Sequence, residues 1–369
     1  MIIGIHSIAA FKKQKTGVEE YAFQLIKHLA MLPEAREHHF LLYTDKGGDL
    51  GFDLPENFEI RILKWSAFAW TQARLSLEML KKECDVLFIP AHVLPIVHSR
   101  NSVVAIHGLE YEYFPEHYPF WFSKYLRWST KYAARNARKI TTVSNNTKKD
   151  LVELYGVSEK KIKVIHHGVE KSEIPPAKIF AKNLGGQEFK NYILYIGRIE
   201  LKKNIVGIIK AFEIFKEKYK LPHKLILAGS PGFGYEKIKY QILHTKYKNT
   251  IIETGYVDNE EKERLYNNAS LFLFPSFYEG FGMPILEAQA RGVPVISSNI
   301  SSMPEVGGQG ALYVDPNGYN DIADKMYALL TDENLRNDMI NKGYENIKKF
   351  SWEKCARETL NVLLDRVLE

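Results

Sequence analysis

The segment from 271 to 297, LFLFPSFYEGFGMPILEAQARGVPVIS, constrains the fold of this chain more than any other. It begins with a short apolar run, Leu271–Phe274, which Pro275 ends. A run without a polar face is typical of a buried strand in a parallel sheet. Glycines at 280 and 282 follow, so the next loop can bring bare backbone close to a ligand. We therefore expect the strand to lead into a loop with room for a bound molecule.

A short helix and a second strand follow that loop. Pro284 suits the first turn of a helix, where its missing N–H has no consequence, and Arg291-Gly292 is typical of a helix C-terminus about two turns later. Val295–Ser297 has the pattern of another buried strand. This strand–loop–helix–strand unit aims a helix N-terminus over the strand ends. Open α/β sheets bind ligands there, and anions favour helix N-termini.

Two carboxylates lie in this unit, Glu279 in the loop and Glu287 in the helix, with seven residues between them. We expect Glu287 in the first turn of the helix, with its side chain leaning back toward the N-terminus. Both carboxylates can then face one pocket. From the spacing alone, an ordinary loop carboxylate and a solvated helix carboxylate remain the alternative.

Length and composition indicate a globular protein of two domains. The chain has 369 residues, too many for one typical core. It has no run of eighteen apolar residues, and its first residues, MIIGIHSIAA, predict a strand rather than a signal peptide. Two distant cysteines without a CxxC pair indicate a reducing compartment and no disulfide or zinc site. The net charge of +6 is too small to imply a nucleic-acid partner.

Strand and helix patterns alternate along the whole chain, which predicts parallel α/β domains. Strands are expected over 2–5, 40–43, 59–63, 86–89, 103–106, 140–143, 163–165, 192–196, 225–228, 251–254 and 312–316. Helices are expected over 19–30, 120–140, 147–155, 204–219, with Asn204 as N-cap, 259–268, 321–330 and 350–364. Residues 173–190 mix Pro, Gly and polar side chains and predict a linker. The expected parts are thus 1–172, the linker, 191–350, and a final helical segment, 351–369.

Polar residues just past predicted strands are further site candidates. His107 follows one strand and is itself followed by Gly108. Arg198 and Lys203 lie just after another, and Gly17 lies in the loop after the first strand. A structural histidine, two surface cations and an ordinary loop glycine are the alternatives.

The segment FYEGFGMPILEAQARGVPVISSNISSMPEV resembles the signature of retaining glycosyltransferases of family GT4, which have the GT-B fold. Glu279 and Glu287 match the family's E-x7-E element. GRIELKKN resembles its G-R-x4-K-N element, whose Arg and Lys hold the donor diphosphate, and VIHHGVE resembles its entry to the interdomain linker. Family members usually carry His-Asp where this chain has His107 and Gly108, so the second residue there has no counterpart.

The resemblance implies two facing, doubly wound Rossmann-like domains with an interdomain cleft. The acceptor would bind mainly to the N-terminal domain and the nucleotide sugar to the C-terminal one, and the last helix would pack back on the N-terminal domain. The residues implied to bind the donor are Gly17, Arg198, Lys203, Glu279, Gly280, Phe281, Gly282 and Glu287. Those implied in catalysis are His107, Glu279, Arg198 and Lys203.

The implied reaction is transfer of a sugar, with retention at the anomeric carbon, from a nucleotide diphosphate donor to a glycan or lipid-linked glycan in polysaccharide or lipopolysaccharide biosynthesis. GDP-mannose is the preferred donor, with UDP- or dTDP-sugars as alternatives. The chain has no Asp-x-Asp element, so we expect no metal and no other cofactor: Arg198 and Lys203 take the place of a divalent ion. A nucleotide-sugar hydrolase or epimerase on the same fold, and a non-catalytic binding subunit, are the rival functions.

The resemblance also gives the two carboxylates different roles. Glu287 is implied to hold the ribose hydroxyls, and Glu279 to lie beside the sugar ring. We therefore expect Glu287→Gln to weaken nucleotide binding, and Glu279→Gln to leave it near that of the parent protein while lowering kcat.

The predicted helix 120–140 suggests a membrane contact. On a helical wheel, Lys124, Arg127, Lys131, Arg135 and Arg138 share one stripe, with Trp121, Tyr125, Trp128 and Tyr132 beside it and Phe122, Leu126, Ala133 and Ala137 opposite. Basic charge beside aromatic rings suits an anionic membrane interface. We therefore expect a cytoplasmic protein in peripheral contact with the inner face of a membrane. A solvated charged face with packed aromatics is the alternative.

Overall fold

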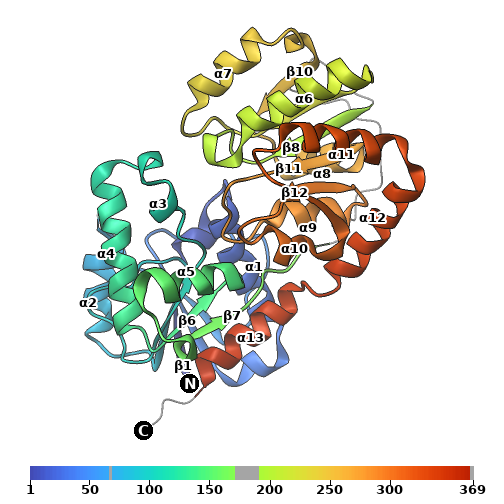
Figure 1. Cartoon of the computed structure of the whole chain (residues 1–369). Coiled ribbons are helices and arrows are strands. Elements are labelled where there is room, and N and C mark those ends of the chain that lie inside the picture. The colour runs from blue at the N-terminus through green and yellow to red at the C-terminus, as the bar shows by residue number, and fades with distance from the viewer. Residues whose placement is uncertain (66–68, 171–190, 366–369) are drawn as a thin grey trace. The chain divides into compact units, whose positions relative to one another are not determined.

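A computed structural model of the chain describes residues 1–65, 69–170 and 191–365. The chain divides into two compact units (Figure 1). The first comprises Met1–Gly168 together with Phe350–Glu369, and the second comprises Val169–Lys349. The sequence places these boundaries at 172 and 350, and its linker, 173–190, lies outside the described residues. The described helices include none with the length and hydrophobicity needed to cross a bilayer.

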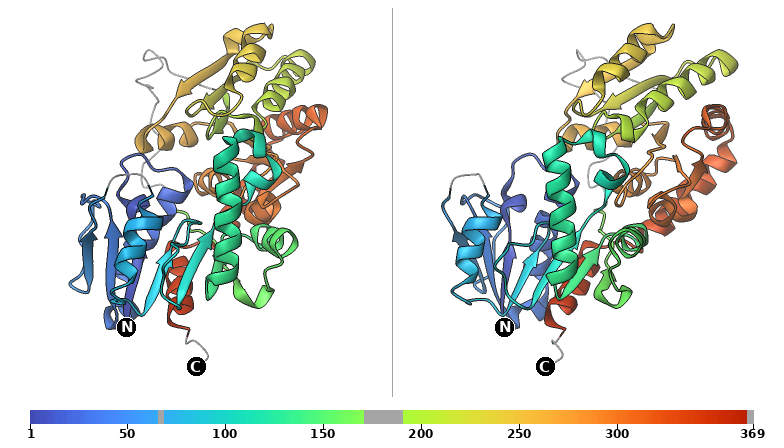
Figure 2. Two further views of the ribbon diagram at one scale, coloured as in Figure 1. Left: turned by 90° about the vertical axis from the view of Figure 1, so that its left-hand side faces the viewer. Right: turned by 60° about the vertical axis from the view of Figure 1, so that its left-hand side comes forward.

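The first unit is built on a seven-stranded parallel sheet in the order β3-β2-β1-β4-β5-β6-β7. Its central strands are buried throughout, which explains their continuous apolar runs. The strands are β1 (Ile2–His6), β2 (His39–Thr44), β3 (Phe58–Ile62), β4 (Val86–Ile89), β5 (Ser102–Ile106), β6 (Lys139–Thr142) and β7 (Ile162–Val164). In the left view of Figure 2, α4 lies in front of this sheet and α13 behind it. The helices are α1 (Gly17–Met31), α2 (Ser76–Met79), α3 (Glu110–Tyr113), α4 (Phe120–Asn136), α5 (Asn145–Tyr155) and α13 (Trp352–Leu364).

Helix α4 differs from its prediction in length and in facing. It ends at Asn136 rather than near residue 140. Arg138 therefore lies beyond it and donates hydrogen bonds to the last carbonyls of α13, at 2.9 Å from that of Val362 and 3.3 Å from that of Leu363. Arg127 forms an ion pair with Glu112, with 2.9 Å between its Nε and the Glu112 Oε2. Phe122, expected on the packed side, is exposed.

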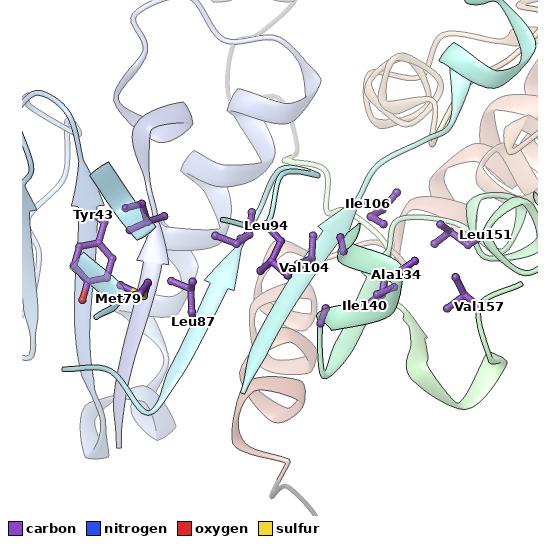
Figure 3. Packing of buried hydrophobic residues seen from close by; sticks show 14 of the residues in the cluster. Tyr43, Met79, Leu87, Leu94, Val104, Ile106, Ala134, Ile140, Leu151 and Val157 are labelled. Atoms are coloured by element: carbon purple, nitrogen blue, oxygen red, sulfur yellow. The ribbon is translucent and has the colours of Figure 1, made fainter. Parts of the chain in front are cut away.

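One hydrophobic core of the first unit lies between the sheet and the helices in front of it (Figure 3). Leu87, Val104 and Ile140 of adjacent strands meet Ala134 of α4 and Leu151 of α5. Small residues at this contact let α4 lie close to the sheet, so its larger side chains point elsewhere.

The second unit repeats the architecture with a six-stranded parallel sheet in the order β10-β9-β8-β11-β12-β13. Its strands are β8 (Tyr192–Ile196), β9 (Lys224–Ala228), β10 (Ile251–Gly255), β11 (Leu271–Phe274), β12 (Val295–Ser298) and β13 (Ala311–Val314). Its helices are α6 (Ile205–Tyr219), α7 (Tyr235–His244), α8 (Asn259–Asn267), α9 (Met283–Ala290), α10 (Met303–Gly307), α11 (Tyr319–Thr331) and α12 (Glu333–Ile347). The sequence analysis predicts neither α7 nor α12, and it also does not predict the short helices α2, α3 and α10.

Both sheets are therefore doubly wound, as the sequence predicts. The strand order reverses between β1 and β4 in the first unit and between β8 and β11 in the second. Loops at the carboxyl ends of strands flanking such a reversal form the ligand site of open α/β sheets. The expected cleft between the units stays a prediction.

Candidate active site

Two loops of the second unit bring opposite charges together at its reversal point. Lys203 ends a single 3-10 turn, Leu201–Lys203, that follows β8, and Glu279 lies in the loop that follows β11. The Lys203 Nζ is 2.5 and 2.6 Å from the two carboxylate oxygens of Glu279. The two side chains are only 16% and 12% exposed. A cation and a carboxylate, 76 residues apart in sequence, are thus held at one sheet edge.

Arg198 supplies a second cation in the loop after β8. Its carbonyl accepts a hydrogen bond from the Tyr195 hydroxyl at 3.0 Å, and its side chain passes over Gly232 with no room for a Cβ there. The Arg198 side chain is exposed, and its guanidinium makes no ion pair with any residue that the structure describes. This charge is available to an anion.

Asn204 follows Lys203 and is the N-cap residue of α6, as predicted, but its side chain does not cap the helix. Its backbone is left-handed, with φ of +60°, and its side chain makes no cap hydrogen bond. Instead the side-chain amide donates to the carbonyls of Pro275 and Pro316, at 3.1 and 2.6 Å. Asn204 therefore ties the turn that carries Lys203 to the loop that carries Glu279.

Serines after β12 fix the Glu279 loop from the other side. The Ser302 hydroxyl donates to the carbonyls of Glu279 and Phe281, at 2.9 and 2.6 Å. The Ser301 hydroxyl donates to the Glu279 carbonyl at 2.8 Å and accepts from the Glu279 N–H at 3.2 Å. These bonds hold the backbone at Glu279 in one conformation.

The glycines of this loop lead directly into α9. Gly282 is the N-cap residue with φ of +111°, a conformation that only glycine adopts without strain. Gly280 is partly exposed, whereas the Phe281 ring is buried inside the unit. A ligand at this loop would therefore meet the backbone of Gly280 rather than the ring of Phe281.

Glu287 is the fifth residue of α9, just past the first turn in which it was predicted, and it faces α8. Its carboxylate accepts hydrogen bonds from the Lys262 Nζ at 2.9 Å and the Tyr266 hydroxyl at 3.0 Å. Burial raises the pKa of Glu287, but Lys262, Arg291 and the Tyr266 hydrogen bond outweigh it, so the net pKa is lowered and the group is ionised. Glu279 and Glu287 therefore pair with different lysines from different elements.

The first unit places His107 at the end of β5, in a packed group of rings. His107 is 8% exposed, and its Nε2 lies 2.6 Å from the Pro90 carbonyl in the loop after β4. Burial and the neighbouring His92 lower the pKa of His107 to about 3. A carbonyl only accepts, so Nε2 carries the proton of this neutral ring and Nδ1 is left as an acceptor. His107 can therefore accept a hydrogen bond from a substrate hydroxyl but cannot serve as a general acid.

Helix α13 supports the His107 ring group. The ring of Tyr21 from α1 lies 4.7 Å from that of His107 and 4.8 Å from that of His167. His167 in turn stacks on Trp352, the first residue of α13, at 5.5 Å. A side chain at Gly168 would lie 2.1 Å from the Trp352 nitrogen, so glycine is required for this close approach. The last helix thus packs within the first unit, behind His107.

Gly17 is the first residue of α1 and is exposed. A Cβ at this position would meet no atom within 4 Å. Packing inside the first unit therefore gives no reason for glycine here.

The structure joins Lys203 to Glu279, leaves Arg198 exposed in the preceding turn, and sets Glu287 in a separate ion-pair group within the same unit. The sequence did not single out Ser301, Ser302, Lys262, Tyr266 and the rings around His107. Only the serines left a signal, since SSNISS after a buried strand is rich in residues that bond backbone carbonyls.

Comparison with known proteins gives consistent results along the whole chain. A family model described as Glycosyltransferase Family 4 matches residues 15–173, and one described as Glycosyl transferases group 1 matches residues 178–346. O-antigen chain mannosyltransferase B of Escherichia coli is 29% identical over 97% of this chain and 98% of its own length. O-antigen chain mannosyltransferase RfbU of Salmonella typhimurium is 27% identical over 85% of this chain and 86% of its own length.

Solved structures share the fold at lower identity. WaaG, a glycosyltransferase involved in lipopolysaccharide biosynthesis, has a TM-score of 0.75 at 14% identity, with 99% of this chain and all of that chain covered. HepE from Anabaena, solved in complex with UDP-glucose, has a TM-score of 0.72 at 16% identity, with 99% of each chain covered.

Proposed function

Because this chain belongs to glycosyltransferase family 4 and is a hexosyltransferase of the GT-B fold, we propose that it transfers mannose from GDP-mannose to a glycan or lipid-linked glycan acceptor. Sugar transfer in polysaccharide or lipopolysaccharide biosynthesis is the broader function that its relatives support. The observation that carries the site assignment is the pairing of Lys203 with Glu279 at the reversal point of the second sheet. The choice of mannose is supported by the names of two relatives that match most of the chain.

The cations after β8 suit a departing nucleoside diphosphate. Negative charge grows on the bridging oxygen as the bond to the sugar breaks, and fixed cations stabilise it in the transition state. Arg198 is exposed with a guanidinium fork that pairs with no carboxylate in the described residues, and Lys203 is held in the next turn. We propose that these two residues take this role without a divalent metal.

Retention follows in this proposal from attack on the face that the diphosphate leaves. The departing phosphate oxygen accepts the proton of the acceptor hydroxyl, so no side chain needs to act as a general base. A neutral His107 fits this scheme, since its Nδ1 can orient a hydroxyl while the ring stays uncharged. Glu279 is proposed to lie beside the sugar ring and Glu287 at the ribose hydroxyls. Gly17 and Gly280 have no side chain, and the diphosphate and the sugar are proposed to approach the exposed backbone at these two residues.

Thermal unfolding in the presence of candidate donors tests the assignment. A ligand that binds only the folded state raises the free energy of unfolding, by about 2.7 kcal/mol at a concentration of 100 times its Kd, and therefore raises Tm. We expect GDP-mannose and GDP to raise Tm more than UDP-glucose or a dTDP-sugar does. A larger rise with UDP-glucose would move the donor to the UDP class, as in the HepE complex. GDP-mannose consumed at equal rates with and without acceptors would favour a hydrolase or epimerase, and tight binding without turnover a non-catalytic subunit.

A lipid-linked acceptor lies at a membrane surface. The proposal therefore places the protein in the cytoplasm, in peripheral contact with anionic lipid at the inner face of the membrane.

A further inference from the structure

Helix α4 carries a row of aromatic rings on its outer side. The rings of Phe122, Tyr125, Trp128 and Tyr132 follow one another with centroid separations of 6.5, 5.9 and 5.6 Å. The inner side of the helix holds buried Ala133 and Ala134 instead. Tyr132 packs partly against the core, whereas Trp128 is 46% exposed and Phe122 47% exposed.

The apolar surface continues from α4 onto the loop 94–98. The Tyr132 hydroxyl donates to the Ile96 carbonyl at 2.8 Å, and the Tyr132 ring meets that of His98 edge-on. Leu94 is fully buried and anchors the loop, which leaves Ile96 and Val97 exposed beside α4.

The same loop is joined to α2. The Val97 N–H donates to the Ser76 hydroxyl of α2 at 3.2 Å, and the Gln72 side chain just before α2 donates to the Leu94 carbonyl at 3.2 Å. Leu77 and Leu80 of this segment are 52% and 60% exposed. The left view of Figure 2 looks onto this side of the first unit, with α4 running down it. We call this surface, formed by α2, loop 94–98 and α4, the α2–α4 face.

The α2–α4 face exposes more large apolar side chains than a solvated surface needs. Six of them carry the argument: Leu77, Leu80, Ile96, Trp121, Phe122 and Trp128. Trp121 is 78% exposed, which leaves most of its ring in water. Contiguous exposed apolar surface of this kind marks an interaction site.

The charge on this face is basic. Helix α4 has no acidic residue, and its exposed cations are Lys124, Lys131 and Arg135. Lys124 lies with its Nζ 4.5 Å from the centre of the Phe120 ring, so its stem covers apolar surface while its charge stays in water. The acid of α2, Glu78, is buried and paired with Arg74 and Lys81.

We infer that the α2–α4 face docks on a bilayer containing anionic phospholipid, with Trp121 and Trp128 at the level of the headgroups. Indole rings prefer the membrane interface, and cations beside them attract anionic headgroups. The face is largely helical and its exposed cations are scattered along α4, which fits a fluid lipid surface. The α2–α4 face would be the surface that makes the membrane contact of the proposed function. The inference rests on that proposed function only in that a lipid-linked acceptor would require the contact.

Co-sedimentation of the full chain with vesicles tests the face. Vesicles of phosphatidylcholine with about one third phosphatidylglycerol should bind the protein at low salt and release it as salt rises. Lys124→Gln combined with Lys131→Gln should lower the partition coefficient about 30-fold, since each lysine near an anionic surface contributes roughly a fivefold factor. The matched control is Lys160→Gln with Lys163→Gln, which removes the same charge from exposed lysines at β7. Equal loss in both pairs, or no binding by the parent chain, would overturn the inference.

Fluorescence quenching by lipids brominated on their acyl chains locates the inserted residues. Trp121→Phe with Trp128→Phe keeps apolar rings on the face, so the variant should still bind but lose most of the quenching. Leu80→Ser should weaken binding, whereas Leu243→Ser, on α7 with 53% exposure, should not. Unchanged quenching in the double Phe variant would place another surface in the lipid. A concentration-dependent dimer that Leu80→Ser disperses would assign the face to self-association instead. No donor or acceptor is present in these assays, so their failure leaves the transferase proposal standing.

Discussion

The Glu279 carboxylate is ion-paired with Lys203, and replacing Glu279 should change nucleotide binding. The carboxylate takes the Lys203 Nζ through both oxygens, at 2.5 and 2.6 Å. An incoming diphosphate that uses Lys203 must therefore compete with an internal anion. The sequence alone predicts that Glu279→Gln leaves nucleoside diphosphate binding near that of the parent. The ion pair changes that expectation to tighter binding.

The size of the effect follows from the geometry and the burial of the pair. Two unit charges about 4 Å apart interact by ~4 kcal/mol at an effective dielectric constant of ~20. The side chains are 16% and 12% exposed, so solvent screens them only in part. Desolvation offsets much of the Coulomb attraction. We therefore take ~1–2 kcal/mol as the free energy with which Glu279 opposes an anion at Lys203. This corresponds to GDP binding that is about 5- to 30-fold tighter in Glu279→Gln.

Isothermal titration calorimetry with GDP and with UDP measures this change without an acceptor. Glu279→Gln should bind the nucleoside diphosphate more tightly yet turn over the donor more slowly, because the sugar loses its carboxylate. The gain should vanish when Lys203→Gln is added, which closes a double-mutant cycle. Glu260→Gln is the matched control, since that carboxylate is 64% exposed and pairs with Arg264 on the surface of α8. Weaker or unchanged GDP binding in Glu279→Gln would refute the competition.

Three further predictions concern the metal, the second carboxylate and the buried histidine. Activity should persist in excess EDTA, and a loss restored by Mg²⁺ or Mn²⁺ would contradict the assignment of Arg198 and Lys203 to the diphosphate. Glu287→Gln should raise the donor KM and weaken GDP binding by ~1–3 kcal/mol, because it leaves the ribose hydroxyls poorly paired. Calorimetry with GDP measures this change, and an unchanged affinity would show that Glu287 does not contact the nucleotide. The pKa of His107 is lowered to about 3, so the unfolded state takes up its proton first as pH falls below 6.5. The free energy of unfolding, from urea titrations between pH 7 and pH 4, should therefore fall more steeply in the parent than in His107→Gln; parallel slopes would show that His107 is not buried as a neutral ring.

The strands of both sheets were predictable because their apolar runs are local. Leu271–Phe274 is predicted at its observed bounds, and the apolar run of Val86–Ile89 likewise. The ends of the helices were less predictable than the strands. Helix α4 stops at Asn136, where a periodic pattern continues through Arg138, because the chain must turn into β6. No local pattern reports that turn.

The contacts of the site were beyond the sequence because they join distant residues. Spacing places Glu279 and Glu287 on one unit, but the lysines that bind them come from the turn after β8 and from α8. Asn204 shows the same limit: its place at the N-terminus of α6 was predictable, but its side chain bonds two carbonyls brought close by the fold instead of capping the helix.

The central claim is retaining transfer from GDP-mannose, and the anomeric configuration of the product tests it most directly. The purified chain would be incubated with GDP-mannose and a panel of mannosides or lipid-linked sugars, and the new linkage examined by NMR. We predict an α-linked mannosyl product, with one GDP released for each linkage formed. A β-linked product would contradict the same-face mechanism, and GDP-mannose left untouched while another nucleotide sugar is transferred would contradict the donor.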